Sequence, residues 1–161
     1  MPRGARMLME NVCYHIINRG NQKERIFLEN ADFEKYLQLL KHCKRKFGFK
    51  LFGYCLMPNH VHVMLEPNDP VALAKIMQSI TQTYTFWFNK KYKKSGHLWQ
   101  GRFKNMIIHK DDYFLQCVNY VEANPVRAGL VSSPAEYPWS SYRGRVFGGY
   151  KSFLLDLPDS T

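Results

Sequence analysis

The sequence predicts one α+β domain, residues 1–161, built around an antiparallel sheet. Three observations lead to this prediction. The chain has 161 residues and is 45% hydrophobic, which suits a single domain with a core of its own. Its apolar residues recur at every second position in some segments and at every third or fourth in others, the periods of strands and helices. These segments follow the order strand, helix, strand, strand, helix, strand.

The first two expected elements are a strand at residues 11–18 and a helix at residues 30–46. One face of the strand carries Val12, Tyr14 and Ile16, and the other carries Cys13, His15 and Ile17. In the helix, apolar residues recur every three or four positions, so one stripe packs inward. Asn30 or Asp32 is the expected cap at its start.

A close pair of strands and a second helix come next. Residues 49–57 and 61–66 have strand patterns, and Pro58 and Asn59 between them predict a tight turn. The second helix is expected at residues 70–91. Pro70 suits its first turn, where the missing N–H of proline does no harm.

A fourth strand is expected at residues 104–109 and a third helix at residues 110–123. Asn124 and Pro125 end this helix, because the residue before a proline disfavours helical geometry. Residues 132–161 contain prolines and glycines that predict a loop-rich C-terminal tail.

The order of the first six elements is that of a ferredoxin-like α+β sandwich, in which an antiparallel sheet carries its helices on one face. Under this fold, the helix at residues 110–123 is an addition that must pack against the sheet or its edge. It carries Tyr120, so its position decides where that side chain lies.

The charge distribution suggests a polyanionic partner. The 23 Lys and Arg residues outnumber the 13 Asp and Glu residues, which gives a net charge of +10. No acidic residue occurs between Asp69 and Asp111, and residues 1–10 form a basic N-terminal arm with Arg3 and Arg6. A phosphate backbone is the natural partner for such a field, although charge alone also fits a protein that is merely basic.

The cysteines and the N-terminus predict a cytoplasmic protein without membrane association. The four cysteines are far apart and form no CxxC pair, so they indicate buried thiols in a reducing compartment. The chain begins without the apolar run of a signal peptide, and no later segment reaches a membrane-spanning length.

His60 and His62 are candidate metal ligands. They begin a predicted strand, so alternation places both imidazoles on one face and Val61 on the other. By itself the spacing fits structural histidines equally well. Val61, Val63 and Leu65 form a consistent core face, however, which leaves the histidines on the opposite one. Two imidazoles are too few for a closed zinc centre, so further ligands or open positions are expected.

Tyr120 and Asn124 are spaced i and i+4, which places a phenol and an amide on one side of the third helix. The alternative is that Tyr120 is a half-buried aromatic and Asn124 only a C-terminal helix residue. Tyr92 and Tyr113 are competing tyrosines in the same region of the chain.

Residues 89–104 interleave positive charge with the aromatic rings of Tyr92, Trp99 and Phe103. Positive side chains follow phosphates, and rings stack on unpaired bases. The alternative is a solvated loop whose aromatic rings tuck back into the core, which Phe103 fits better than a DNA contact does.

Five strings in the chain resemble the single-tyrosine HUH transposases, and within them the REP-associated tyrosine transposases. They are YHIINRGN at residues 14–21, YCLMPNHVHVML at 54–65, WQGRF at 99–103, YVEANPVRAGLV at 120–131 and YPWSS at 137–141. They occur in the order of the family and are spread over the chain from residue 14 to residue 141. The ferredoxin-like fold of the family agrees with the predicted element order.

The resemblance implies the roles of four residues. His60 and His62 are the HUH pair, Tyr120 is the nucleophile, and Asn124 matches the third metal ligand, for which close relatives use glutamine. The implied activity is metal-dependent cutting and rejoining of single-stranded DNA at hairpins through a 5′-phosphotyrosine, with Mg²⁺ or Mn²⁺ polarising the scissile phosphate.

The resemblance and the basic stretch together predict the DNA-binding residues. They are Arg3, Arg6, Arg19, Lys93, Lys94, Trp99, Gln100, Arg102 and Lys104. The expected partner is single-stranded or hairpin DNA, bound by a monomer or a homodimer in the nucleoid of a bacterium. An inactive hairpin-binding or regulatory module is the alternative function. An unrelated histidine-rich metal enzyme is a third reading, but the chain has neither a HExxH helix nor a cysteine set.

Overall fold

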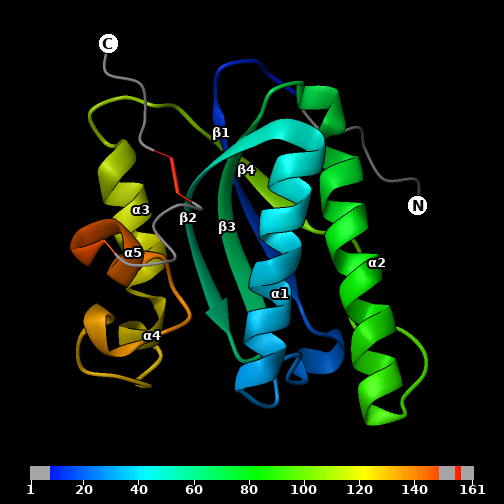
Figure 1. Ribbon diagram of the computed structural model, residues 1–161. Coiled ribbons are helices and arrows are strands. Elements are labelled where there is room, and N and C mark those ends of the chain that lie inside the picture. The colour runs from blue at the N-terminus through cyan, green and yellow to red at the C-terminus, as the bar shows by residue number, and fades with distance from the viewer. Residues whose placement is uncertain (1–7, 149–154, 157–161) are drawn as a thin grey trace.

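The computed structural model describes residues 8–148 and 155–156, and its centre is a four-stranded antiparallel sheet with the order β2-β3-β1-β4 (Figure 1). The main elements are β1 (Cys13–Arg19), α1 (Asn30–Cys43), β2 (Phe49–Met57), β3 (His60–Pro67), α2 (Leu73–Tyr92), β4 (Lys104–Ile108) and α3 (Phe114–Glu122). Two short helices follow, α4 (Asn124–Arg127) and α5 (Tyr142–Phe147). The predicted α+β class and ferredoxin-like order are confirmed.

Two details of the first helix differ from the prediction. α1 ends at Cys43, and a π-helical segment, Lys44–Gly48, leads into β2. The cap residue is Glu29 instead of Asn30 or Asp32. Asp32 instead lies inside the first turn, where its carboxylate accepts hydrogen bonds from the backbone N–H groups of Leu28 and Glu29. It satisfies two backbone donors without being the cap itself.

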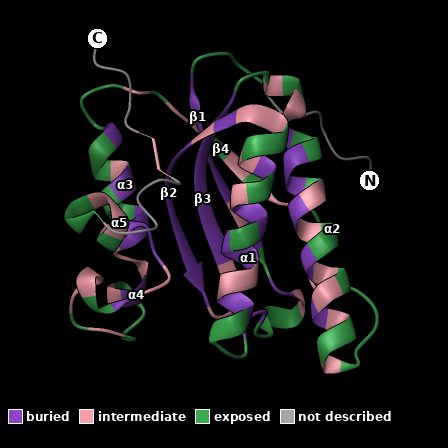
Figure 2. Cartoon of the chain, viewed as in Figure 1, coloured by how far each residue is buried: buried purple, intermediate pink, exposed green. Residues whose placement is uncertain are grey.

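Helices α1 and α2 cover one face of the sheet with a large hydrophobic core. Val61, Val63 and Leu65 of β3 all point into this core, as their alternation predicted. The surfaces where these helices meet the sheet are buried and their outer sides are exposed (Figure 2). Because strand side chains alternate between the two faces, the side chains of β3 that lie between these three point to the opposite face of the sheet.

Helix α3 covers the opposite face with a smaller hydrophobic cluster, which includes Phe52, Met64, Phe114 and Val118. Gly53 on β2 allows a close approach here. A Cβ atom on Gly53 would lie 3.3 Å from a methyl carbon of Val118, closer than most carbon contacts. The molecule is therefore a three-layer structure, with the added helix on the face opposite α1 and α2 (Figure 1).

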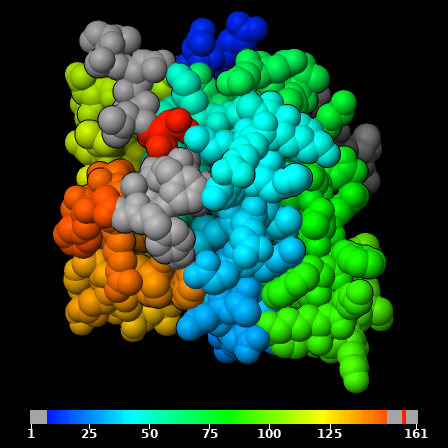
Figure 3. Space-filling model, viewed as in Figure 1, coloured from blue at the N-terminus to red at the C-terminus, as the bar shows by residue number. Residues whose placement is uncertain are grey.

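The C-terminal tail, residues 132–161, was expected to be loop-rich, but its described part includes α5 and forms hydrogen bonds with β2. Its segment 137–141 runs along the outer edge of β2, where the backbone N–H of Leu56 donates to the carbonyl of Trp139 and the hydroxyl of Tyr137 donates to the carbonyl of Leu56. Asp156 exchanges hydrogen bonds with Leu51 on the same strand. These contacts cover an edge that would otherwise present unpaired backbone groups. In the space-filling view this tail (gold to orange) and α2 (green) lie on opposite sides of α1 (Figure 3).

None of the helices within the described ranges is both long and apolar enough to cross a membrane.

Candidate metal site and nucleophile

Strand β3 places His60 and His62 on the face of the sheet that α3 covers. In the antiparallel register, His60 lies opposite Arg19 of β1, and His62 lies opposite Ile17. His60 is partly exposed, whereas His62 keeps only 6% of its surface accessible. The two ring centroids are 5.0 Å apart. The alternation predicted from the sequence thus brings both imidazoles to one place.

Each histidine has one nitrogen engaged, which determines the nitrogen that remains for an ion. Nδ1 of His62 is 2.9 Å from Nε2 of His15, and Nδ1 of His60 is 2.7 Å from the amide oxygen of Asn59. That oxygen only accepts, so Nδ1 of His60 carries the proton and Nε2 keeps its lone pair. Nε2 of His62 is buried and has no hydrogen-bond partner. A buried polar atom without a partner is unusual and fits a position that an ion fills.

Burial keeps these rings neutral. It lowers the pKa of His62 to about 3, and the charges of His60, His15, Arg19 and Arg127 add to the effect. Burial, followed by the charge of Arg19, lowers the pKa of His60 to about 4. The pKa of His15 is also lowered by burial. At neutral pH the rings therefore have lone pairs available, which imidazole needs in order to bind a metal.

Tyr120 projects from α3 into solvent with 60% of its surface exposed, so the alternative of a half-buried aromatic does not hold. The guanidinium carbon of Arg127 lies 3.7 Å from the ring centroid, and a guanidinium N–H donates to the carbonyl of Tyr120 at 2.7 Å. The charge of Arg127 also contributes to lowering the pKa of His62, after burial and the charges of His60, His15 and Arg19. The phenol is accessible and lies beside a cation.

Asn124 begins α4, two residues after Glu122 ends α3, so it lies just beyond the helix that carries Tyr120 and not on that helix as predicted. Pro125 has no N–H and cannot extend the hydrogen bonds of α3, which explains the break at Ala123. The amide nitrogen of Asn124 donates to the carbonyl of Val121 at 2.8 Å. Its oxygen, the atom through which an amide binds a metal, is the remaining group. Among the residues that the structure describes, no group of three His, Cys, Asp or Glu side chains is placed to hold a metal ion.

Comparison with known proteins identifies the family of the chain. Residues 8–124, well over half of the chain, match the family model described as "Transposase IS200 like". The chain belongs to the IS200-like transposase family. The resemblance predicted from the sequence is thereby confirmed.

Two named relatives belong to the predicted branch. A putative REP-associated tyrosine transposase of Haemophilus influenzae is 28% identical over 122 residues, which cover 69% of this chain and 66% of that protein. The REP-associated tyrosine transposase of Escherichia coli is 25% identical over 117 residues, which cover 70% of this chain and 68% of that protein. A solved structure of a REP-associated tyrosine transposase bound to a REP hairpin superposes with a TM-score of 0.75 at 18% identity. It covers 100% of this chain and 92% of its own, and it supports the fold.

The DNA-binding residues predicted for this transposase are mostly exposed. Arg3 and Arg6 lie outside the described residues. Arg19, Lys93, Lys94, Gln100, Arg102 and Lys104 are all exposed. Trp99 is partly buried, and its indole N–H donates to the carbonyl of Thr81 at 3.3 Å. Its ring lies near the buried rings of Tyr36 and Tyr84, so most of its surface packs against the core.

Three residues that lie beside the candidate site or on the helix that carries Tyr120 were not predicted from the sequence. His15 of β1 faces His62 from the neighbouring strand. The sequence contained one signal for this, because the alternation of β1 places His15 and Ile17 on the same face of the sheet. Arg127 was included only as one residue of the string at residues 120–131 that resembles the family. Glu122 is fully buried, accepts a hydrogen bond from the hydroxyl of Ser141 at 2.5 Å and pairs with Arg145 at 2.6 Å. It thereby fixes α3 to the tail.

Proposed function

We propose that this chain is a metal-dependent single-stranded DNA endonuclease and strand transferase that acts at DNA hairpins through a 5′-phosphotyrosine. The observation that carries the proposal is that two neutral histidines, one with a buried unpartnered Nε2, lie on the face of the sheet covered by α3, the helix that carries the exposed Tyr120 beside Arg127. Family membership supports the reaction class. The names of the relatives, and the REP hairpin bound in the similar structure, support the kind of DNA.

His60, His62 and Asn124 would hold the divalent cation. Imidazole nitrogen and amide oxygen together suit Mn²⁺ and are acceptable to Mg²⁺. When bound, the ion polarises the scissile phosphate and stabilises the negative charge that develops on it. His15 orients His62, because a hydrogen bond at Nδ1 leaves Nε2 as the metal-binding nitrogen.

The covalent step is a displacement at phosphorus. The phenol oxygen of Tyr120 forms a bond to phosphorus and loses its proton, while the bond from phosphorus to the 3′ oxygen breaks and that oxygen takes up a proton. The products are a tyrosine linked to the 5′ phosphate and a free 3′-OH. Attack by another 3′-OH reverses the step and joins strands without an energy source. Arg127 places positive charge where the phosphate must approach Tyr120.

The decisive experiment is detection of the covalent adduct. The protein is incubated with a hairpin oligonucleotide carrying single-stranded flanks and Mg²⁺ or Mn²⁺, then denatured, and the mass of the Tyr120 peptide is measured. We expect a nucleotide adduct on Tyr120, none in Tyr120→Phe, and normal hairpin binding by that variant in a gel shift.

Tyr113→Phe is the matched control. Tyr113 is the N-cap of α3 and is 67% exposed, so it is as accessible as Tyr120 but about two helical turns away. This variant should still form the adduct. Adduct formation by Tyr120→Phe, or no adduct on any tyrosine of the wild type under conditions where the hairpin binds, would contradict the mechanism. The latter result would favour an inactive hairpin-binding module.

A further inference from the structure

Helix α3, which carries Tyr120, packs on the sheet through a smaller hydrophobic surface than α1 and α2 do. It has nine residues, and Phe114, Val118 and Val121 form its buried apolar side. Hydrophobic contacts have no direction, so this packing alone sets neither the rotation of α3 nor its height above the sheet. Tyr120 is exposed, and the position of its phenol depends on both. Directional bonds to α3 therefore decide where the phenol lies.

Glu122 at the end of α3 receives such bonds from the tail, whose helix α5 lies beside α3 (Figure 1). The hydroxyl of Ser141 donates to Oε2 of Glu122 at 2.5 Å. Arg145 of α5 donates to the same carboxylate through two nitrogens, from Nη2 to Oε1 at 2.6 Å and from Nε to Oε2 at 3.1 Å. A guanidinium fork fixes the orientation of a carboxylate as well as its distance. The tail thereby restrains the last turn of α3.

Arg145 also holds α3 at Asn119. Its Nη2 donates to Oδ1 of Asn119 at 2.7 Å. Asn119 and Glu122 are three residues apart and lie on one side of the helix. Successive residues turn by about 100° around the helix axis, so Tyr120 projects from a different side. The rotation of α3 is thus restrained from the side that does not carry the phenol.

Ser141 is in turn bound to strand β2. The backbone N–H of Tyr54 donates to its hydroxyl oxygen at 2.9 Å, and the N–H of Ser141 donates to the carbonyl of Tyr54 at 3.0 Å. A Cβ atom on Gly53 would lie 3.3 Å from Oγ of Ser141, so glycine allows this close approach. Cys55, the next residue of β2, lies opposite His62 in the register of β2 with β3. A short path of contacts therefore leads from α3 through Ser141 to the part of the sheet that holds His62.

We propose that Ser141 and Arg145 form a tail clamp that positions Tyr120 for attack by holding α3 through Glu122. Both act through Glu122 and not on the substrate, so they are positioning residues. The inference rests on the proposed function, because it concerns the same nucleophile. The match to the family model ends at residue 124, so the clamp lies in a part of the chain that this match does not cover. The tail is a working part of the site as well as a cover for the edge of β2.

The first test compares two neighbouring serines. Ser141→Ala removes the hydroxyl that bonds to Glu122, whereas Ser140→Ala removes a similarly buried hydroxyl whose oxygen accepts from the N–H of Tyr142 inside the tail. Adduct formation on Tyr120 is followed over time with Mn²⁺ and a saturating hairpin that carries single-stranded flanks. Ser141→Ala should form the adduct about tenfold more slowly than the wild type, because a small misplacement of a reacting group is costly. Ser140→Ala should react at the wild-type rate.

The second test changes the shape of the cation and keeps its charge. Arg145→Lys loses the planar fork that contacts Glu122 and Asn119 together. It should slow adduct formation roughly 10- to 100-fold. Arg143→Lys changes an exposed arginine of the same helix, and its rate should equal that of the wild type.

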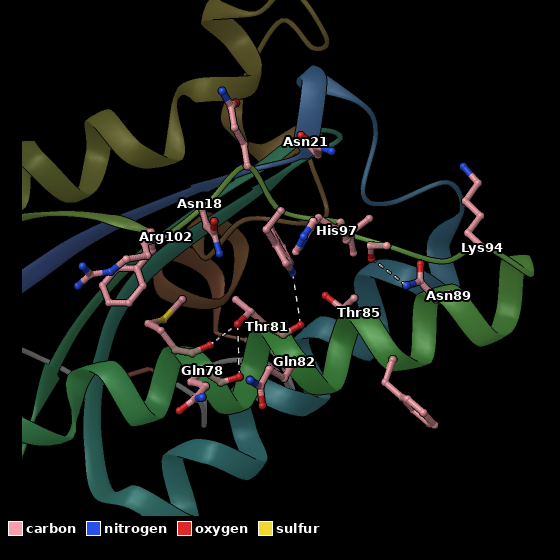
Figure 4. A pocket seen from close by; sticks show the side chains of 18 of the residues that line it. Asn18, Asn21, Gln78, Thr81, Gln82, Thr85, Asn89, Lys94, His97 and Arg102 are labelled. Atoms are coloured by element: carbon pink, nitrogen blue, oxygen red, sulfur yellow. Dashed lines mark hydrogen bonds between the residues drawn. The ribbon is translucent and has the colours of Figure 1, made fainter. Parts of the chain in front are cut away.

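Hairpin affinity in chelator-treated buffer should stay unchanged in both clamp variants. Lys94 and Arg102, two of the predicted DNA-binding residues, line a cavity of about 1240 Å³ between α2 and residues 94–103, on the face of the sheet opposite α3 (Figure 4). The clamp variants change neither residue. The loss should therefore lie in the rate at saturating DNA and not in the DNA concentration needed for half-saturation.

The time course separates positioning from stability. A merely structural role would lower the fraction of the protein that reacts but leave the rate constant of the folded molecules at the wild-type value. A positioning role lowers the rate constant while the final yield of adduct stays close to that of the wild type. Clamp variants that react with the rate constants of their controls would overturn the inference, whatever their yield.

The two proposals fail in different ways. Absence of a covalent adduct on wild-type Tyr120, under conditions where the hairpin binds, would contradict the proposed function and with it the clamp. A normal adduct in the wild type, combined with wild-type rate constants in Ser141→Ala and Arg145→Lys, would contradict only the clamp.

Discussion

The two faces of the sheet are covered in different ways. On the face of α1 and α2, a large hydrophobic core rich in aromatic rings fills the space between the helices and the sheet. On the face of α3 the hydrophobic cluster is smaller, and the buried polar groups of His15, His62 and Glu122 lie on that side. The candidate metal ligands His60 and His62 lie on the second face.

The α1 and α2 face therefore mainly provides stability, whereas the α3 face carries the groups that we propose for chemistry. Hydrophobic packing has no direction and can hold a helix against a sheet without fixing any one atom. Hydrogen bonds are directional, so the face of α3 can keep a chosen nitrogen of His62 available for an ion. Substitutions of the histidines should therefore fail in cleavage or metal-binding assays, whereas substitutions of buried ion pairs on either face should fail in denaturation assays, and the predictions that follow test this separation.

The largest effect is expected at the metal ligands. His60→Ala and His62→Ala should each reduce hairpin cleavage below detection while hairpin binding stays close to normal, because these histidines hold the ion and the basic surface holds the DNA. Nicking assays and gel shifts measure the two properties separately. His42→Ala, which removes an exposed histidine from α1, is the control and should cut normally. Normal cutting by both site variants in chelator-cleaned buffer resupplied with Mg²⁺ would make the metal assignment wrong.

The next largest effect concerns the anchor of α3. The side chain of Glu122 is 1% exposed and that of Arg145 is 23% exposed, so removal of the arginine leaves a buried carboxylate without its cation. Arg145→Met should lower the free energy of unfolding by about 3–5 kcal/mol. Urea denaturation measures this loss. Arg143→Met changes an exposed arginine of the same helix and should cost less than about 0.5 kcal/mol. Equal losses in the two variants would mean that the pair does not anchor α3.

A smaller effect is expected at His15, which touches the proposed ion only through His62. His15→Phe should weaken Mn²⁺ binding roughly 10- to 100-fold, because His62 then loses the hydrogen bond that orients it. Calorimetric titration of Mn²⁺ into the Tyr120→Phe protein bound to a hairpin measures the affinity without turnover. His15→Gln keeps a hydrogen-bonding side chain and should recover part of the affinity. A merely structural role predicts equal stability losses in both variants and unchanged Mn²⁺ affinity.

Local patterns predicted the elements of this fold well. The structure has β2 at the predicted residues because the Pro58-Asn59 turn marks its end, and alternation alone placed His60 and His62 opposite the core. Such signals depend on neighbours in the chain. The ferredoxin-like order then followed from the sequence of elements.

Contacts between distant residues could not be predicted. The partnership of His15 with His62 depends on the register of β1 against β3, which no local pattern specifies. The basic stretch is also less available to DNA than its sequence implies. In this stretch between Asp69 and Asp111, Lys91 pairs with Asp32 and Glu29. Lys110 forms a salt bridge with the buried carboxylate of Glu66 on β3. Similarly, the tail looked loop-rich because its hydrogen-bond partners lie far away on β2.

The smallest expected effect lies on the α1 and α2 face, at Asp32. Burial acts to raise the pKa of this carboxyl, but hydrogen bonds from Lys91, Tyr92 and the N–H groups of Leu28 and Glu29 outweigh burial and hold the pKa below its usual value. A carboxyl whose pKa is lowered by folding stabilises the protein above its unfolded pKa and loses that contribution as the pH falls through its folded pKa.

Asp32→Asn keeps the size of this side chain but removes its charge. It should cost about 1–3 kcal/mol of unfolding free energy at neutral pH, because the side chain is fully buried and its hydrogen bonds are charge-assisted. The difference from the wild type should begin to shrink as the pH falls below about 4, the ordinary pKa of an unfolded Asp, and should be lost once the pH has fallen through the lowered pKa of the folded carboxyl. Denaturation curves between neutral and acid pH measure this change, with exposed Asp112→Asn as the control. A cost that stays constant into strong acid would show that Asp32 acts through packing instead of charge. In either case the Mn²⁺ affinity of Asp32→Asn should equal that of the wild type, because the carboxyl lies on the face of the sheet that does not carry the histidines.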